Sequence, residues 1–136
     1  MAAIIYVAVD PARRLAEARD ADRWSSTNSI LNAVLKYTVD NKGSLPANLT
    51  AVDTGTYVLG TGATCASCGT ATSTTGAGPC VNLTSALVDQ YLSSIPTDPK
   101  TGTAADSQYY IYRSASGRIK VGACSPERAA AIGVAR

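Results

Sequence analysis

The sequence predicts an α+β fold, in which one long N-terminal helix is followed by short antiparallel strands. Two observations lead to this class. Apolar residues recur at helical spacing as far as Thr38, and two segments near the C-terminus have the composition and alternation of strands. A chain of 136 residues is long enough for one domain with a modest core. We therefore expect residues 1–136 to form a single domain.

The chain opens on an apolar segment that contains no charged residue and runs directly into Asp10. This stub consists of Ala2, Ala3, Ile4, Ile5, Tyr6, Val7, Ala8 and Val9. A helix that crosses a bilayer needs about 20 apolar residues, so the stub is too short to span one. It also lacks the basic start and the cleavage site of a secretory signal. We expect it to be the remainder of a longer apolar helix front.

Residues 1–42 are assigned to a spine helix that carries the stub 2–9 at its front. Pro11 suits a first helical turn, or becomes a kink if the helix continues upstream through the stub. The helix should end near Gly43, which can adopt the left-handed cap conformation. Helical spacing is strongest in the second half, at Thr27, Ile30, Leu31, Val34, Leu35 and Thr38.

The first half of this helix is charged. Four arginines (Arg13, Arg14, Arg19 and Arg23) stand among four carboxylates (Asp10, Glu17, Asp20 and Asp22). Because the two signs are interleaved, we expect ion pairs within or between subunits and no specific nucleic-acid site.

Residues 43–80 read as a loop region rich in Thr, Gly and Ala, with one plausible strand over 56–59. Residues 81–127 should hold a short helix and a β-hairpin. The helix is expected over 81–93, because four apolar residues there fall on one face. The Ala-rich residues 128–136 are expected to form a loose tail.

The predicted hairpin joins strands over 109–113 and 118–123. In the second strand Ile119, Val121 and Ala123 point to one face, which indicates a half-buried antiparallel strand. Three tyrosines in the first strand resemble a platform for stacking bases. Alternation nevertheless favours their packing in the sheet.

Several segments carry a family resemblance in their order along the chain. They are residues 2–21, 41–46 (Asn-Lys-Gly-Ser-Leu-Pro), 91–99 (Tyr-Leu-Ser-Ser-Ile-Pro-Thr-Asp-Pro), 109–112 (Tyr-Tyr-Ile-Tyr) and 121–127 (Val-Gly-Ala-Cys-Ser-Pro-Glu). Over residues 2–127 the chain resembles a type IV pilin, or a related pseudopilin, without its leader and the front of its hydrophobic helix. The resemblance implies a pilin-like fold, with the spine helix packed on a small antiparallel sheet.

The same resemblance implies a structural subunit of an extracellular filament. The full-length precursor would reside in the inner membrane and then join identical subunits in a helical, cell-surface pilus. Surface attachment, motility and DNA uptake all fit this role. The alternatives are the major pseudopilin of a type II secretion apparatus and, less favoured, a soluble cysteine metal-binding module. The family's processing glycine and early glutamate have no counterpart here, so the chain as given should not be processed, inserted or polymerised in the normal way.

Four cysteines are candidates for disulfides: Cys65, Cys68, Cys80 and Cys124. In an exported chain disulfides are the default, and three pairings are possible. We favour a link from Cys124 to the central loop, with the remaining two cysteines closing a small loop. The spacing of Cys65 and Cys68 also suits zinc, but no second close pair follows, so we expect no metal.

Composition argues against an enzyme. The chain has no His, the commonest general base near neutral pH, and we expect no catalytic site and no cofactor. Asp98 and Asp106 raise the possibility of calcium, but turn chemistry and solvation explain them better, since calcium requires several close oxygen ligands.

The charges are unevenly distributed along the chain. Residues 43–108 carry four aspartates against Lys100, a net −3, whereas residues 109–136 carry five basic residues against Glu127, a net +4. This asymmetry suits head-to-tail association of subunits.

Overall fold

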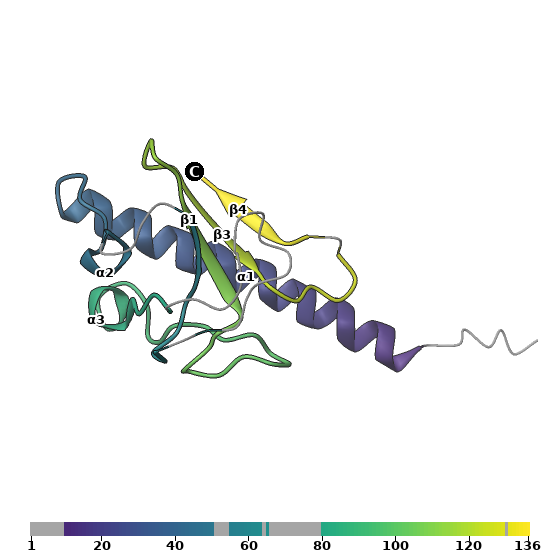
Figure 1. Cartoon of the computed structure of the whole chain (residues 1–136). Coiled ribbons are helices and arrows are strands. Elements are labelled where there is room, and N and C mark those ends of the chain that lie inside the picture. Colours follow the sequence, from purple (N-terminus) through teal and green to yellow (C-terminus); the bar gives the residue numbers. More distant parts are fainter. Residues whose placement is uncertain (1–9, 51–54, 64, 66–79, 130) are drawn as a thin grey trace, which may run out of the picture.

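A long helix lies beside a small antiparallel sheet in the computed structural model, which describes residues 10–50, 55–63, 65, 80–129 and 131–136 (Figure 1). Helix α1 spans Pro11–Asp40. The sheet has four strands in the order β1-β2-β3-β4, and every neighbouring pair is antiparallel. The predicted α+β class is confirmed.

Both ends of α1 follow from local sequence. Asp10 has an extended backbone (φ −73°, ψ 102°), and its carboxylate accepts a hydrogen bond from the Arg13 N–H at 3.4 Å. Pro11 therefore occupies the first helical turn, where its missing N–H is not needed. At the other end the Gly43 N–H donates to the Thr38 carbonyl at 2.8 Å. This bond is that of a Schellman-type end, in which the left-handed residue is Lys42 (φ 58°) and not the predicted Gly43, although Gly43 also has a positive φ of 89°.

The sheet grows from the predicted hairpin by one strand on each side. Tyr57 of β1 faces Ile111 of β2, Ile111 faces Val121 of β3, and Val121 faces Val134 of β4. The strands are β1 (Gly55–Val58), β2 (Tyr109–Arg113), β3 (Ile119–Ala123) and β4 (Gly133–Ala135).

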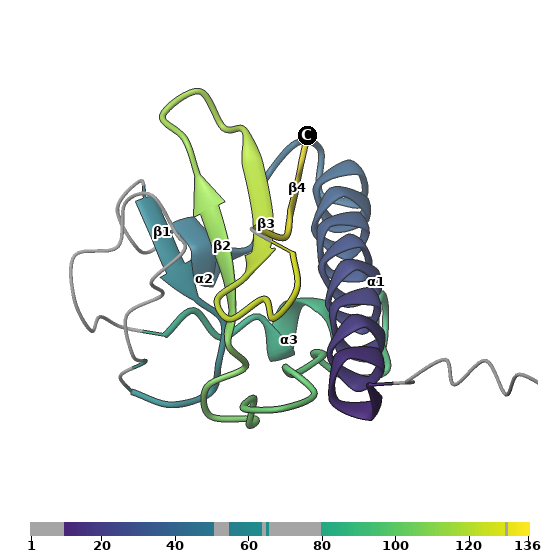
Figure 2. The same cartoon turned by 90° about the vertical axis from the view of Figure 1, so that its right-hand side faces the viewer.

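One face of the sheet packs on α1, which contacts β3 and β4 (Figure 2). The core there joins Ile30 and Val34 of the helix to Ile111 and Val121 of the sheet. The opposite face is covered by a smaller cluster of Val58, Cys65, Tyr110 and Cys124. Tyr109 and Tyr110 are thus buried on opposite faces, and the prediction that they pack in the sheet is confirmed.

The helix predicted over 81–93 is much shorter than expected. Only one turn forms, α3 (Thr84–Leu87), while Val81 bridges to Leu59 beside the sheet. Val88 is extended and Asp89 has φ 78°, which ends the helix. Apolar spacing over so short a run does not distinguish a helix from irregular structure. A second single turn, α2 (Ala47–Thr50), was not predicted.

The C-terminal segment is ordered, so the expectation of a loose tail over 128–136 was wrong. Strand β4 pairs with β3, and the Ala123 N–H donates to the Ile132 carbonyl at 3.0 Å. Ile132 is only 1% exposed and belongs to the main core. The prediction rested on the alanines of this segment. The segment also contains two β-branched residues, Ile132 and Val134, which favour a strand beside the open edge of the sheet.

Candidate functional site: a buried ion-pair network and the surface of the spine helix

Arg23 lies at the centre of a buried ion-pair network between the helix and the C-terminal half of the chain. Its side chain is 1% exposed, and its Nε and Nη2 donate to the two carboxylate oxygens of Asp98 at 2.6 and 3.1 Å. Its Nη1 donates to Asp20 Oδ1 and to Glu127 Oε2, both at 2.8 Å. Three acidic side chains from distant parts of the sequence thus meet one guanidinium.

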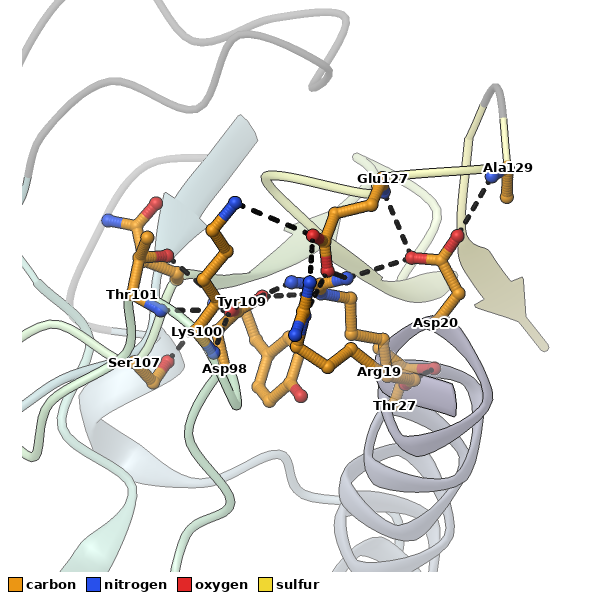
Figure 3. Close-up of polar contacts among 12 residues, drawn as sticks. Arg19, Asp20, Thr27, Asp98, Lys100, Thr101, Ser107, Tyr109, Glu127 and Ala129 are labelled. Carbon is orange, nitrogen blue, oxygen red and sulfur yellow. Dashed lines mark hydrogen bonds and ion pairs between the residues drawn. The ribbon is translucent and has the colours of Figure 1, made fainter. Parts of the chain in front are cut away.

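Glu127 and Asp20 attach the segment after β3 to α1 (Figure 3). Arg19 donates to both carboxylate oxygens of Glu127, at 2.6 and 2.7 Å. In return the Asp20 carboxylate accepts the backbone N–H groups of Glu127, Arg128 and Ala129 at 2.7–2.9 Å. The chain therefore returns to the helix immediately before it forms β4.

The sequence explains how each partner is placed. Asp20 and Arg23 are three residues apart, so they share one face of α1. Asp98 sits in a turn, where its Oδ1 accepts the N–H groups of Lys100 and Thr101 at 2.9 and 3.1 Å. Lys100 Nζ in turn lies 3.5 Å from Glu127 Oε1. Three cations thus meet three carboxylates, so the network is balanced in charge.

The network perturbs the ionisation of its carboxylates. Hydrogen bonds from Arg19 and Arg23 hold the pKa of Glu127 well below its usual range. Burial alone would raise the pKa of Asp98, but the hydrogen bond from Arg23 and the backbone N–H donors lower it below its ordinary value. For Asp20, burial is likewise outweighed by hydrogen bonds from the backbone and from Arg23, so its pKa is also lowered. All three groups are therefore held in the charged form.

The charged half of α1 was predicted to form ion pairs, and the structure shows two kinds. Arg13 pairs with Glu17 on the exposed surface at 3.2 Å, one turn along the helix. Arg19 and Arg23 instead reach across the fold, which sequence reasoning did not find. A signal was present, because Asp20 and Arg23 fall on the same face as Thr27 and the apolar residues that follow.

The residues considered for calcium are engaged elsewhere. The oxygens of Asp98 face Arg23 and two backbone N–H groups, whereas Asp106 Oδ1 accepts hydrogen bonds from the backbone and side chain of Gln108. Within the described ranges, no cluster of three or more His, Cys, Asp or Glu side chains is arranged to hold a metal ion.

The cysteines fasten the outer face of the sheet. Cys65 and Cys80 form a disulfide, with 5.2 Å between their Cα atoms, and Cys124 is disulfide-bonded as well. Cys68 and the stub residues 2–9 lie outside the described residues. A zinc site built from cysteines requires thiolates, which disulfide sulfurs do not supply. The metal-module hypothesis therefore loses Cys65, Cys80 and Cys124 as ligands.

The outer surface of α1 carries large apolar side chains that no core explains. Leu15 is 58% exposed, Trp24 40% and Val39 78%. Near Val39 a groove of about 570 Å³ opens between the end of α1 and Tyr91. No helix in the described part of the chain has both the length and the hydropathy needed to cross a membrane.

Comparisons with known proteins leave the family open. No family model matches the chain, and no curated protein or solved structure matches it either. The resemblance to type IV pilins therefore remains a hypothesis that rests on the sequence motifs and is compatible with the fold.

Proposed function

We propose that this protein is a structural subunit of an extracellular type IV pilus-like filament. The observation that carries the proposal is the placement of α1. The second half of the helix is built into the core, whereas Pro11–Leu15 are all exposed and lie beyond the sheet (Figure 1). The apolar stub 2–9 directly precedes this projecting end. A helix of this form suits a spine that joins a globular head to neighbouring subunits.

Assembly would be driven by burial of the apolar helix front. Each Å² of apolar surface removed from water contributes about 25 cal/mol. The partners are identical subunits, and the full-length precursor would lie in the inner membrane before it joins a cell-surface pilus. The disulfides on the outer face of the sheet suit a protein that works outside the cell.

The major pseudopilin of a type II secretion apparatus has the same architecture, so cellular location separates the two roles. The test uses native cells that carry the unmodified gene. Immunogold labelling is expected to mark long surface filaments, and N-terminal sequencing with intact mass should show an apolar stretch that extends upstream of Met1.

Two results would count against this function. Label confined to the cell envelope would favour the pseudopilin. A soluble protein that begins at Met1, with no labelled fibre, would contradict a filament role altogether. As a control for the antibody, cells with the gene deleted should show no label.

A further inference from the structure

The groove beside the end of α1 is lined by both apolar and charged residues. Leu35, Val39 and Tyr91 supply apolar surface, and polar or charged residues complete the lining: Asn32, Lys36, Asp40, Gln90 and Arg136. The volume of about 570 Å³ falls in the range of sites that bind a few side chains or a small ligand. Exposed apolar surface beside charged residues is typical of interaction sites.

The floor of the groove is held in a defined shape. The Tyr91 hydroxyl donates to Asp40 Oδ2 at 2.7 Å, and its ring packs edge-on against Tyr37, with 6.0 Å between ring centroids. Both contacts tie the segment after α3 to the last two turns of α1. A ligand would therefore find the groove already formed and would not have to order it.

The chain itself contains a segment with the matching chemistry. Residues 2–9 form an uninterrupted uncharged run that includes Ile4, Ile5, Val7 and Val9. Such a run is unfavourable in water and gains from any apolar surface that covers it. It is also short enough for a groove of this size to cover a substantial part of it.

The stub of the same copy cannot reach the groove. Asn32, the groove residue nearest the start of α1, lies 22 positions beyond Asp10, about 33 Å along the helix axis. Ala2 lies eight positions before Asp10, and a fully extended chain of that length reaches only about 28 Å. Val39 lies farther away still. Any stub in the groove must therefore come from another copy.

We propose that this groove binds the apolar segment 2–9 of a second copy of the chain. The inference rests on the proposed filament function and names the surface that receives the helix front. The contact is heterologous, because it joins two different surfaces, so each bound pair keeps one free stub and one free groove. Assembly is then head-to-tail and open-ended.

The test measures self-association of the full chain by sedimentation velocity over a range of concentrations. Two variants each remove one surface: Val39→Glu places a charge in the groove, and Ile5→Asp places one in the stub. Each is expected to weaken association by roughly tenfold or more, because docking would bury a carboxylate in place of an apolar side chain. Ala21→Glu is the matched control, since it adds the same charge to an exposed position of α1 outside the groove. Circular dichroism and Tm verify that each variant is folded.

Mixing the two variants gives the decisive result. Val39→Glu keeps an intact stub and Ile5→Asp keeps an intact groove, so the mixture should form a heterodimer and nothing larger. Three results would overturn the proposal. Normal association of Ile5→Asp would indicate groove-to-groove contact, normal association of Val39→Glu would indicate stub-to-stub contact, and a monomeric wild-type chain would mean that the groove does not bind the stub.

Failure of this inference can be told apart from failure of the filament function. If native cells carry labelled filaments but the mixed variants stay monomeric, the filament role stands and the groove is not the receiving surface. If the variants complement each other but cells carry no fibres, the groove contact stands and the filament role falls.

Discussion

Arg23 ties together three carboxylates that lie far apart in the sequence, and its burial makes the arrangement costly to disturb. The guanidinium and Asp98 are almost fully hidden from solvent, at 1% and 0% side-chain exposure. A buried pair is weak evidence of net stabilisation, since desolvation opposes the attraction. Removal of one partner is different, because it leaves an uncompensated charge inside the protein.

Replacement of Arg23 by Met should therefore destabilise the fold by about 3–5 kcal/mol. Urea unfolding followed by circular dichroism measures the change. Arg13→Met is the matched control, because its ion pair with Glu17 is exposed and should contribute only about 0.2–0.5 kcal/mol. Equal losses of unfolding free energy in the two variants would show that the buried network contributes no more to stability than the exposed ion pair.

The lowered pKa values of Asp20, Asp98 and Glu127 make stability depend on acid. The unfolded chain binds protons at these groups at a higher pH than the folded chain does. Their contribution is thus fully present above the ordinary carboxylate pKa of about 4 and is lost as the pH falls below it. We expect Tm to drop steeply below about pH 4.

The variant Glu127→Gln tests this linkage. It removes one group with a lowered pKa, so its Tm should fall less steeply with acid than that of the wild type, from a lower starting value at pH 7. Parallel curves for the two proteins between pH 7 and pH 2 would contradict the assignment.

Strand β4 was not predicted, because the segment that contains it is rich in alanine. Its strand closes the sheet beside α1, and the residue before it, Ile132, enters the main core. The return of the chain to the helix at Glu127 places this segment where it can pair. The ion-pair network around Arg23 thus helps to position β4.

Truncation of Ile132 to Ala should destabilise the protein by about 2–5 kcal/mol, because the side chain is 1% exposed and its loss leaves a cavity. Leu15→Ala provides the comparison, since Leu15 is largely exposed and its change should cost little. If the two variants unfold at the same urea concentration, the C-terminal segment does not contribute to the core.

The Cys65–Cys80 disulfide closes a loop beside the outer face of the sheet. It joins residues 15 positions apart across a segment rich in Gly and Thr. The double variant Cys65→Ser/Cys80→Ser should lose about 3 kcal/mol in the chain-entropy model of loop closure. Urea unfolding tests the loss, and peptide mapping without reductant tests the pairing. Free thiols at both positions in the purified native protein would contradict it.

Across the whole molecule, part of the uneven charge along the sequence is neutralised by ion pairs within the domain. Asp98 and Glu127 are engaged inside the domain, so they are not available to a neighbouring subunit. Arg118, by contrast, is exposed at the tip of the hairpin. In the proposed filament, electrostatic attraction between subunits would therefore depend on exposed groups such as Arg118 and Asp89.

In the proposed filament, reversal of charge by Arg118→Asp should weaken the contact between subunits, and more so at low salt, where screening is least. Filament dissociation by heat or dilution, measured by electron microscopy at two salt concentrations, tests this. Asp89→Arg should have a similar effect from the opposite surface. Filaments that are unchanged by both substitutions would rule out this electrostatic contribution.

Features that depend on neighbours along the chain could be predicted from the amino-acid sequence. The period of the apolar residues predicted α1, Pro11 and Gly43 marked its ends, and alternation predicted β2 and β3. These signals are local, because helix caps, turns and strand alternation involve residues a few positions apart. The prediction of a helix over 81–93 was wrong, because the helix ends at Leu87, where the extended backbone of Val88 follows.

Contacts between residues far apart in the sequence became known from the folded structure. Arg23 joins Asp98 and Glu127 across 75 and 104 positions, and no local pattern predicts such a contact. The strand β4 and the groove near Val39 also depend on how the chain returns to α1. A buried charge requires a partner of opposite charge, and an open sheet edge requires a further strand. Which residue or strand fills each place depends on how distant parts of the chain pack together.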